Sequence, residues 1–442
     1  MKILTKKWFL ISGFYTVTGV LPLLLWLLIP GPQLVVYNLF FFCTTVARVT
    51  GLVGLGLFSG NLLLSGRFTF LDRWFGGLDT VYRFHRQTGY DALAVLSLHA
   101  AAIMVRSVFF YISSGQLYGI SGGLTLTISL GLLAYVLLVM AIFFNIFLSR
   151  KLKYEHLKLV HQTLGIILFI AALHSVLISV SFSRSLWLEI YLITLASAGV
   201  LSYLWRTLFK EWFVDQQTVL LKSVQQLPGG ITELIFDRGT NTFTFIPGQF
   251  MFISFSNILF LRENHPFSIT SSTADRHISF AAKEVGDFTS KLASLKPGLQ
   301  ARLQGPFGGF TPYNLKHKRQ VWIAGGIGIT PFLSMCRTLY NRPREFTSYT
   351  IFLYYSVVNE NDLTFIQELQ IIAMKFSNFH VFPWVSADQG YITGKIIADK
   401  IDLNNTSIMI CGSPRFVFSL KSQCLEHGVK KSDIRTEEFQ LL

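Results

Sequence analysis

Six apolar segments in the first half of the chain restrict what this sequence can fold into. Each segment is long enough to cross the roughly 30 Å hydrocarbon layer of a bilayer as a helix. They cover residues 8–30, 39–64, 85–112, 123–149, 160–182 and 186–207. We therefore expect a six-helix membrane bundle over residues 1–210. The N-terminus has no small-residue cleavage site, so we expect a retained first helix and no removed signal peptide.

Basic residues are unevenly distributed around these segments. Residues 1–210 contain 16 Lys and Arg against 5 Asp and Glu, and the rest of the chain contains 22 against 19. The loops near 31–38, 113–122 and 182–186 contain Arg184 alone, while the alternate connections are rich in Lys and Arg. The positive-inside rule predicts an integral plasma (inner) membrane protein with both termini cytoplasmic. Because the basic excess lies in the apolar half, we expect lipid contact and no nucleic-acid partner.

Two of the segments carry histidine pairs at nearly equal spacing. His85 and His99 lie 14 residues apart, and His161 and His174 lie 13 apart. Thirteen residues of helix make about 3.6 turns and rise roughly 20 Å, so the two imidazoles of a pair point to nearly the same side at two depths. A lone histidine can simply be bonded inside a bundle, but four at matched spacing favour haem ligation. We predict one bis-histidine haem on His85 and His161 and a second on His99 and His174.

An arginine lies inside the second apolar segment. Arg48 is close in depth to the outer histidine pair, so we predict that it pairs with a haem propionate; an arginine that extends to the interface is the alternative. Arg106, seven residues after His99, is a weaker candidate for the same role.

From about residue 212 the pattern changes to short β-rich runs broken by Pro-Gly and Gly-Thr turns. It predicts a small antiparallel barrel over residues 211–312. Its run RENHPFSITSS can border a flat ring system with hydroxyls and backbone amides. The candidate flavin contacts in it are His265, Pro266, Phe267, Ser268, Ile269 and Thr270. Gly286 is expected to open a helix whose free N–H groups, with Thr289, hold a pyrophosphate. Gly305 and Pro306 mark the end of the barrel.

From Gln320 onward, strands alternate with helical stretches, which predicts a parallel α/β sheet that binds a nucleotide over residues 313–442. In VWIAGGIGITPFLSM an apolar strand runs into a glycine-rich turn and a helix. Glycines let the backbone approach a phosphate, and a helix N-terminus attracts it. The candidate residues are Gly325, Gly326 and Gly328, with Thr330 as N-cap and Pro331 at the first helical position.

Two later strand ends complete the predicted nucleotide site. Tyr355 and Ser356 end a strand where an adenosine ribose would lie. Cys411 and Gly412 end another, where small residues would let a nicotinamide lie against the flavin; for Cys411 a buried small hydrophobic residue is the alternative. Phe439 is a candidate to cover the flavin ring, and a core phenylalanine is equally consistent with the sequence. The four cysteines lack CxxC spacing, so neither a disulfide framework nor a zinc site is expected.

Taken together, these residues resemble the NADPH oxidase and ferric reductase superfamily. The paired histidines are followed in order by HPFSIT, GDFT, GPFG, GGIGITPF and CGSP, so the resemblance covers essentially the whole chain. It implies a multidomain membrane protein: a six-helix transmembrane haem bundle, then a ferredoxin-reductase-like module of an antiparallel β-barrel FAD domain and a parallel-sheet NAD(P) domain. The implied cofactors are FAD, two b-type haems, and NADPH or NADH as electron donor.

The chain departs from the superfamily pattern at two places. Val357-Val358-Asn359 stands where relatives often place an arginine for the 2′-phosphate, so the donor stays open between NADPH and NADH. The sequence also shows no extended N-terminal calcium-binding region and no long outer loop, as in the compact bacterial members.

The resemblance implies an oxidoreductase that passes electrons to a small acceptor on the outer side. Dioxygen, which would become superoxide, is the preferred acceptor, and a ferric chelate is the alternative. Two further hypotheses are a transporter with a regulatory nucleotide-binding domain and an electron carrier that feeds a partner protein. The sequence leaves the oligomeric state open.

Overall fold

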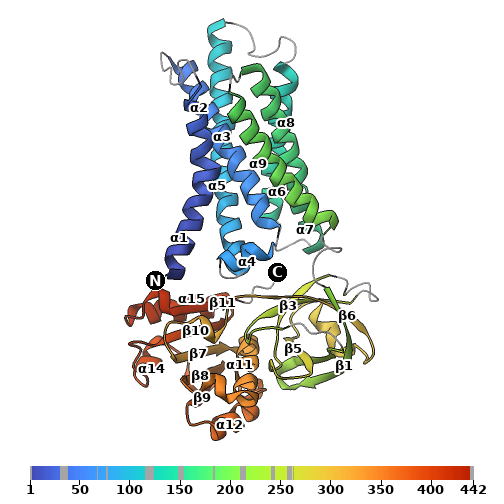
Figure 1. Cartoon of the computed structure of the whole chain (residues 1–442), viewed down its shortest axis with the longest axis vertical. Coiled ribbons are helices and arrows are strands. Elements are labelled where there is room, and N and C mark those ends of the chain that lie inside the picture. Colours follow the sequence, from blue (N-terminus) through green and yellow to red (C-terminus); the bar gives the residue numbers. More distant parts are fainter. Residues whose placement is uncertain are drawn as a thin grey trace. The chain divides into compact units, whose positions relative to one another are not determined.

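The computed structural model describes residues 2–29, 38–66, 68–75, 78–114, 124–147, 154–182, 185–209, 216–239, 244–255, 261 and 263–438. Its contacts divide the chain into two compact units, Met1–Phe213 and Val214–Leu442. We call them the membrane unit and the nucleotide unit. Most of their helices and strands are labelled in Figure 1.

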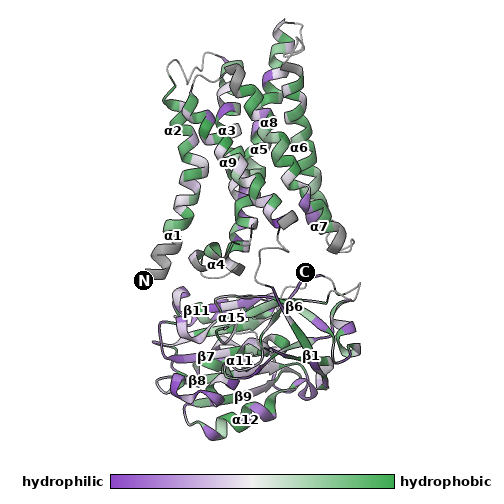
Figure 2. Ribbon diagram, turned by 45° about the vertical axis from the view of Figure 1, so that its right-hand side comes forward, coloured by the Kyte–Doolittle hydropathy of each residue, from purple (hydrophilic) through white to green (hydrophobic). Residues whose placement is uncertain are grey.

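The membrane unit is helical. Its helices are α1 (Lys2–Tyr15), α2 (Leu21–Leu27), α3 (Leu39–Ser65), α4 (Thr69–Phe75), α5 (Leu78–Ser114), α6 (Leu124–Phe147), α7 (Tyr154–Gln162), α8 (Leu164–Phe182) and α9 (Leu186–Leu204). π-helical turns extend two of these helices, over Thr16–Val20 and Trp205–Phe209. Among the described residues, six helical stretches are long and apolar enough to span a membrane. Figure 2 shows hydrophobic residues along most of their length.

Helix α3 lies at the centre of this packing. Asn38 caps it by accepting a hydrogen bond from the Phe41 N–H at 3.1 Å. Its second half is buried continuously from Gly54 to Leu62. A Cβ atom on Gly56 would lie 2.0 Å from the Thr18 carbonyl oxygen, so only glycine permits this approach. Small residues that let backbones come close are typical of helix contacts in membranes.

Two helix bounds differ from those expected. Helix α5 begins at Leu78 instead of residue 85, because a helix continues through polar residues outside the apolar run that a hydropathy criterion detects. The stretch with the second histidine pair is two helices, with His161 in α7 and His174 in α8. The break falls at Thr163. Its N–H donates to the Val160 carbonyl oxygen at 3.1 Å, which is the three-residue spacing of a 3₁₀ turn and not the four-residue spacing of an α-helix.

The nucleotide unit begins with a six-stranded antiparallel sheet. Its strands are β1 (Gln216–Leu227), β2 (Ile231–Asp237), β3 (Phe250–Ser254), β4 (His265–Ser268), β5 (His277–Lys283) and β6 (Gln300–Phe307). They follow the order β4-β3-β6-β1-β2-β5. A bridge between Ile269 and Phe280 brings the two edges together, so the sheet closes as a barrel around an apolar core that includes Phe236 and Leu303.

A five-stranded parallel sheet follows. Its strands are β7 (Arg319–Gly325), β8 (Thr350–Val357), β9 (Phe379–Val385), β10 (Ser407–Gly412) and β11 (Ile434–Glu438), in the order β11-β10-β7-β8-β9. Its helices are α11 (Thr330–Asn341), α12 (Ile366–Lys375), α13 (Ser386–Gln389), α14 (Gly394–Ala398) and α15 (Pro414–Glu426). Separate apolar clusters cover the two sheet faces, one with residues of α11 and α12 and the other with residues of α14 and α15. The strand order reverses between β7 and β10, and ligands of such sheets bind at that reversal.

Arg337 on α11 joins the barrel to the parallel sheet. Its guanidinium donates to both carboxylate oxygens of Glu368 on α12, at 2.7 and 2.9 Å, and to Glu233 on β2 at 2.9 Å. Burial would lower the pKa of Arg337, but the hydrogen bonds and charges of Glu368 and Glu233 outweigh it and raise that pKa. The guanidinium therefore stays charged and ties three elements together.

Candidate functional site

The inner histidine pair lies on α5 and α7. The ring centroids of His85 and His161 are 6.1 Å apart, with the planes at 73°. Two imidazoles on opposite sides of one metal, each with a metal–nitrogen bond of about 2 Å, have centroids roughly 6 Å apart. This spacing therefore fits an iron between the rings.

The outer pair lies on α5 and α8, where His99 and His174 interact electrostatically across the bundle. A metal site built from protein ligands alone would need more groups, and the described residues contain no cluster of three or more His, Cys, Asp or Glu that could hold a metal ion. Two imidazoles suit a metal that brings its other ligands with it. A porphyrin does so with four nitrogens.

Backbone carbonyl oxygens orient three of the four rings. Nδ1 of His85 lies 3.0 Å from the Asn61 carbonyl oxygen, Nδ1 of His99 lies 2.8 Å from that of Ala47, and Nδ1 of His174 lies 2.6 Å from that of Thr127. A carbonyl can only accept, so Nδ1 carries the proton and donates it. Each Nε2 then keeps its lone pair for a metal. These rings are thus in the tautomer that a haem ligand needs.

Glycines make room for the outer pair. A Cβ atom on Gly131 would lie 2.5 Å from Cε1 of His174, and one on Gly51 would lie 3.0 Å from the ring of His99. Each glycine comes four residues after the acceptor carbonyl, which belongs to Thr127 or Ala47. Helical side chains lean toward the N-terminus, so a side chain at this position would cover that carbonyl. Sequence reasoning missed both glycines, although a glycine inside an apolar helix is a visible signal.

An arginine accompanies each pair. Arg206, just after α9, interacts electrostatically with His85 and His161, and Arg106 on α5 interacts with His99. Arg106 also lies 5.9 Å from the ring of Phe40. The side chain of Arg48 is exposed, although Arg48 directly follows the carbonyl that accepts from His99. Sequence reasoning missed Arg206 because it lies at the end of the sixth apolar segment, where a basic residue also fits topology alone.

The carboxyl ends of β7, β8 and β10 lie at one edge of the parallel sheet. The glycine-rich turn after β7 approaches β10 so closely that a Cβ on Gly328 would lie 2.4 Å from the Cys411 carbonyl oxygen. Gly325 and Gly412 both lie against the ring of Phe416. Gly326 adopts a φ of +55°, which favours glycine. The predicted nucleotide residues of these two strands thus meet at the point of strand-order reversal.

The start of the following helix differs from the prediction. The helix α11 begins at Thr330, its N-cap is Ile329, and Pro331 lies in the first turn. Thr330 is therefore not the cap; its hydroxyl donates to the Ile327 carbonyl oxygen at 3.0 Å. The reason is that a 3₁₀ turn over Gly326–Ile329 leads into the helix without an extended capping residue.

The predicted flavin strand β4 presents a row of rings and an unpaired hydroxyl. The ring centroids of His265 and Phe288 are 3.9 Å apart, and those of Phe267 and Phe288 are 5.8 Å apart. Pro266 is exposed. Oγ of Ser268 is buried and has no hydrogen-bond partner among the described residues. A buried hydroxyl without a partner costs free energy, so this strand fits a ligand that supplies a flat face and a hydrogen-bonding atom.

Several predicted contact residues have side chains in the protein interior. Ile269 and Thr270 are fully buried, and the Thr270 hydroxyl bonds with Ser279 at 2.8 Å. Tyr355 is also fully buried, and Ser356 is nearly so. Both residues of each of these consecutive pairs are buried, so at these positions a ligand could meet the backbone but not the side chains.

The run after Gly286 forms a 3₁₀ helix over Thr289–Ser294 and not an α-helix. Its start has no free N–H at Gly286. The Thr289 hydroxyl oxygen accepts from the Gly286 N–H at 3.1 Å and from the Val285 N–H at 3.0 Å. Thr289 thus shapes the turn itself. Gly305 and Pro306 lie within β6 and are joined by a cis peptide bond.

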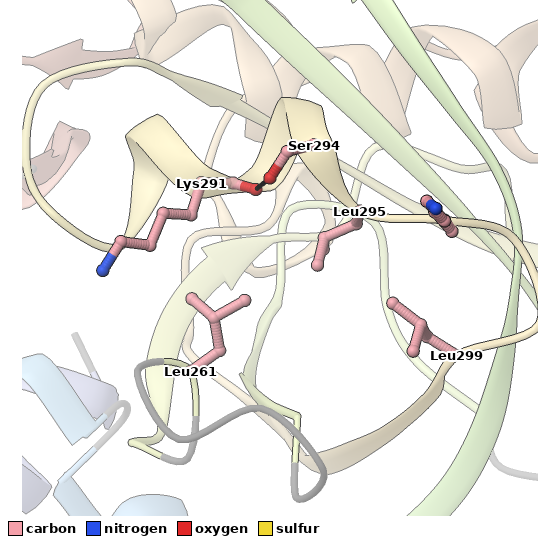
Figure 3. Close-up of a pocket in the computed structure, with 6 residues that line it drawn as sticks. Leu261, Lys291, Ser294, Leu295 and Leu299 are labelled. Carbon is pink, nitrogen blue, oxygen red and sulfur yellow. Dashed lines mark hydrogen bonds between the residues drawn. The ribbon is translucent and has the colours of Figure 1, made fainter.

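A cavity of about 270 Å³ adjoins this 3₁₀ helix (Figure 3). Leu261, Leu295 and Leu299 form its apolar part, and Lys291 and Ser294 line the side made by the 3₁₀ helix. Lys296 is the sixth lining residue. The cavity adds an apolar surface beside this 3₁₀ helix that the sequence did not indicate.

Cys411 is completely buried at the end of β10. Burial and the carboxylate of Glu437 raise the pKa of its thiol. The thiol is therefore neutral, and it fits a small packing residue at the nucleotide edge better than a nucleophile. Phe439 lies outside the described residues.

Three family models match consecutive parts of the chain. They are a ferric reductase like transmembrane component over residues 50–172, an FAD-binding domain over 216–318 and an oxidoreductase NAD-binding domain over 322–421. With the fold described above, they define an integral membrane oxidoreductase with flavin- and nicotinamide-binding domains, and the predicted fold class is confirmed. The chain belongs to the NADPH oxidase and ferric reductase superfamily.

Curated relatives match parts of the chain. Ferric reduction oxidase 7, chloroplastic, of Arabidopsis thaliana is 26% identical over 44% of this chain and 27% of its own length. A superoxide-generating NADPH oxidase heavy chain of Dictyostelium discoideum is 32% identical over 29% of this chain and 21% of its own length. The chain thus spans only about a quarter of these two relatives. The solved cytochrome b5 reductase domain of Ulva prolifera nitrate reductase is 20% identical, with a TM-score of 0.45, and the match covers 50% of this chain and 97% of that one.

Proposed function

We propose that the protein is a transmembrane flavocytochrome that carries electrons from NADH or NADPH, through FAD and two bis-histidine b-type haems, to dioxygen on the outer side. The observation that carries this proposal is the set of three Nδ1–carbonyl bonds, which leave Nε2 of His85, His99 and His174 available as ligands. When bound, FAD would accept a hydride and the haems would relay single electrons.

The chain's own residues hold and separate these groups. His85 with His161 and His99 with His174 would hold the two haems, which when bound would supply one-electron transfer to an acceptor that does not itself bind the iron. A hydride carries two electrons and dioxygen takes one to become superoxide. Each nicotinamide oxidised therefore yields two superoxide ions and one proton. Arg206 and Arg106, with Arg48 as the candidate expected from the sequence, would supply positive charge to the haem propionates.

The basic connections favour cytoplasmic termini, which would put the nicotinamide site inside the cell and the acceptor outside. The same site could serve a ferric chelate, and relatives named for each activity support both acceptors. Relatives are likewise named for NADPH and for NADH. The proposal assigns residues 1–210 to the haem domain, 211–312 to the FAD domain and 313–442 to the NAD(P) domain.

The test is an absorption spectrum of the full chain in detergent, before and after addition of NADH or NADPH. We expect flavin and two low-spin haems per chain, both reduced by the nucleotide under anaerobic conditions. In membrane vesicles, superoxide-dismutase-sensitive reduction of cytochrome c supports dioxygen, whereas dismutase-insensitive activity with rapid ferrous iron formation supports the ferric chelate. A purified protein without a Soret band would contradict the proposal and favour a transporter with a regulatory nucleotide domain.

A further inference from the structure

The turn that follows β8 carries acidic and amide side chains but no cation. The sequence from Arg344 to Lys375 contains no lysine or arginine between these two residues. The turn begins with four consecutive exposed residues: Val358, Asn359, Glu360 and Asn361. Val358 is 61% exposed, so an apolar side chain lies in water at this strand end.

Hydrogen bonds hold this turn in place. The buried Tyr355 hydroxyl donates to the Asp362 carbonyl oxygen at 3.2 Å. The Asp362 N–H donates to the Asn359 carbonyl oxygen at 3.0 Å, and the Leu363 N–H donates to that of Glu360 at 2.9 Å. The backbone that carries Glu360 is therefore anchored to the strand and the core beneath it.

The recorded contacts of this turn, among the described residues, bring it one lysine that is already paired and one further carboxylate. Lys283 on β5 reaches it, but its Nζ lies 3.3 Å from Oδ1 of Asp362 and forms an ion pair there. The neighbouring strand end adds a further carboxylate, because the Ala387 N–H donates to the Val358 carbonyl oxygen at 3.1 Å and exposed Asp388 follows. A phosphate bound at this place would meet these carboxylates without an unpaired lysine or arginine from this turn.

In doubly wound sheets, the strand after the glycine-rich one ends at the adenosine ribose. An acidic side chain there accepts a hydrogen bond from the 2′-hydroxyl of NADH, and an arginine there binds the 2′-phosphate of NADPH. Here β7 carries the glycine-rich turn and β8 is the next strand. We propose that the protein selects NADH over NADPH, with Glu360 as the acceptor for the ribose and Val358 in the place of a phosphate-binding cation. This inference rests on the proposed function, whose donor it specifies.

The experiment measures kcat/KM of the full, FAD-supplemented protein with each nucleotide. We expect NADH to exceed NADPH by at least about tenfold, because the 2′-phosphate adds up to about two negative charges beside carboxylates. V358R should raise kcat/KM for NADPH about tenfold and leave NADH within about threefold. E360Q should lower kcat/KM for NADH and raise it for NADPH, so the ratio between the two nucleotides should fall. E426Q, which removes an exposed carboxylate on α15, should leave that ratio unchanged.

A competition experiment tests the same site without hydride transfer. AMP should inhibit NADH oxidation at lower concentration than adenosine 2′,5′-bisphosphate, and V358R should reverse that order. If kcat/KM of the wild-type protein for NADPH equals or exceeds that for NADH, the inference is overturned and the proposed function stays intact. If neither nucleotide reduces a flavin that dithionite reduces, the proposed function fails and the donor inference fails with it.

Discussion

The membrane unit and the nucleotide unit build their sites in opposite ways. In the membrane unit the four histidines lie on helices, and carbonyl oxygens of neighbouring helices orient three of them. In the nucleotide unit the candidate nicotinamide residues lie at strand ends, where the backbone itself turns toward the ligand. The first kind of site depends on packing between distant segments, and the second depends mainly on local sequence. Mutations should therefore affect the two sites in different ways.

The largest effect is expected from the histidines. His174→Ala and His161→Ala should each lower the haem content from two to about one per chain, because a haem with one axial imidazole is held weakly. Pyridine haemochrome assay with protein quantification measures this. His427→Ala, at an exposed position after α15, is the control. Either variant with a full complement of low-spin haem would refute the assignment of these ligands.

The next largest effect is expected from the glycines that lie beside the outer histidines. Gly131→Ala should displace the His174 ring and reduce outer-haem content by about half or more, because an added Cβ would lie 2.5 Å from that ring. Gly51→Ala should do less, since its Cβ would lie 3.0 Å from His99. Gly13→Ala, where a Cβ meets nothing within 4 Å, should have no effect. Equal haem content and unchanged low-spin spectra in all three would mean that helix packing does not position the outer pair.

A smaller and separate effect is expected in the nucleotide unit. Arg337→Met leaves Glu233 buried without its partner and should destabilise this unit by about 3 kcal/mol. Thermal release of FAD, followed by flavin fluorescence, should shift to lower temperature while the haem spectrum stays unchanged. Arg342→Met removes an exposed pair with Glu345 and should cost less than about 0.5 kcal/mol. A parallel loss of haem would show that the two units do not respond independently.

Asn61 should show a weaker effect within the membrane unit. Its side chain donates to the His85 carbonyl oxygen at 2.5 Å and to the Thr88 hydroxyl at 2.8 Å, while its own carbonyl accepts from His85. Asn61→Ala removes the first two bonds and keeps the third, so both haems should remain. We expect a loss of about 1–3 kcal/mol in stability and altered EPR g-values of the inner haem. Asn145→Ala, which removes a bond within one helix, should leave those g-values unchanged.

The smallest effect is a dependence on alkaline pH. Burial raises the pKa of Cys424 to about 11. The folded state thus holds its proton more tightly than the unfolded state, whose thiol ionises near pH 8.5. Stability from this group is fully present below about pH 8.5 and falls by about 1–2 kcal/mol as the pH rises to about 10. Cys424→Ala should flatten the curve of FAD-release temperature against pH over this interval; an unchanged slope would contradict the prediction.

In the nucleotide unit, the sequence predicted which strand ends lie together. The glycine-rich turn after β7 and the Cys-Gly end of β10 meet as expected, because parallel strands share their carboxyl edge. Individual contacts were less predictable. The run from His265 to Thr270 was treated as one contact surface, yet Ile269 and Thr270 point into the interior. A sequence run shows which residues are near a site, but which of their side chains face the ligand depends on how the strand end packs against its neighbours.

In the membrane unit, residue spacing predicted four histidines at two levels, because helical rise converts sequence separation into depth. The break at Thr163 between His161 and His174 could not be read from that spacing. The apolar segments likewise determined a membrane bundle, and the order of motifs determined the superfamily. Only the tertiary structure decided which carbonyl oxygens accept from three of the imidazoles, which glycines leave room for His99 and His174, and that Arg206 lies near the inner pair. Helical periodicity is local to each segment, whereas the contacts between helices depend on how all of them pack at once.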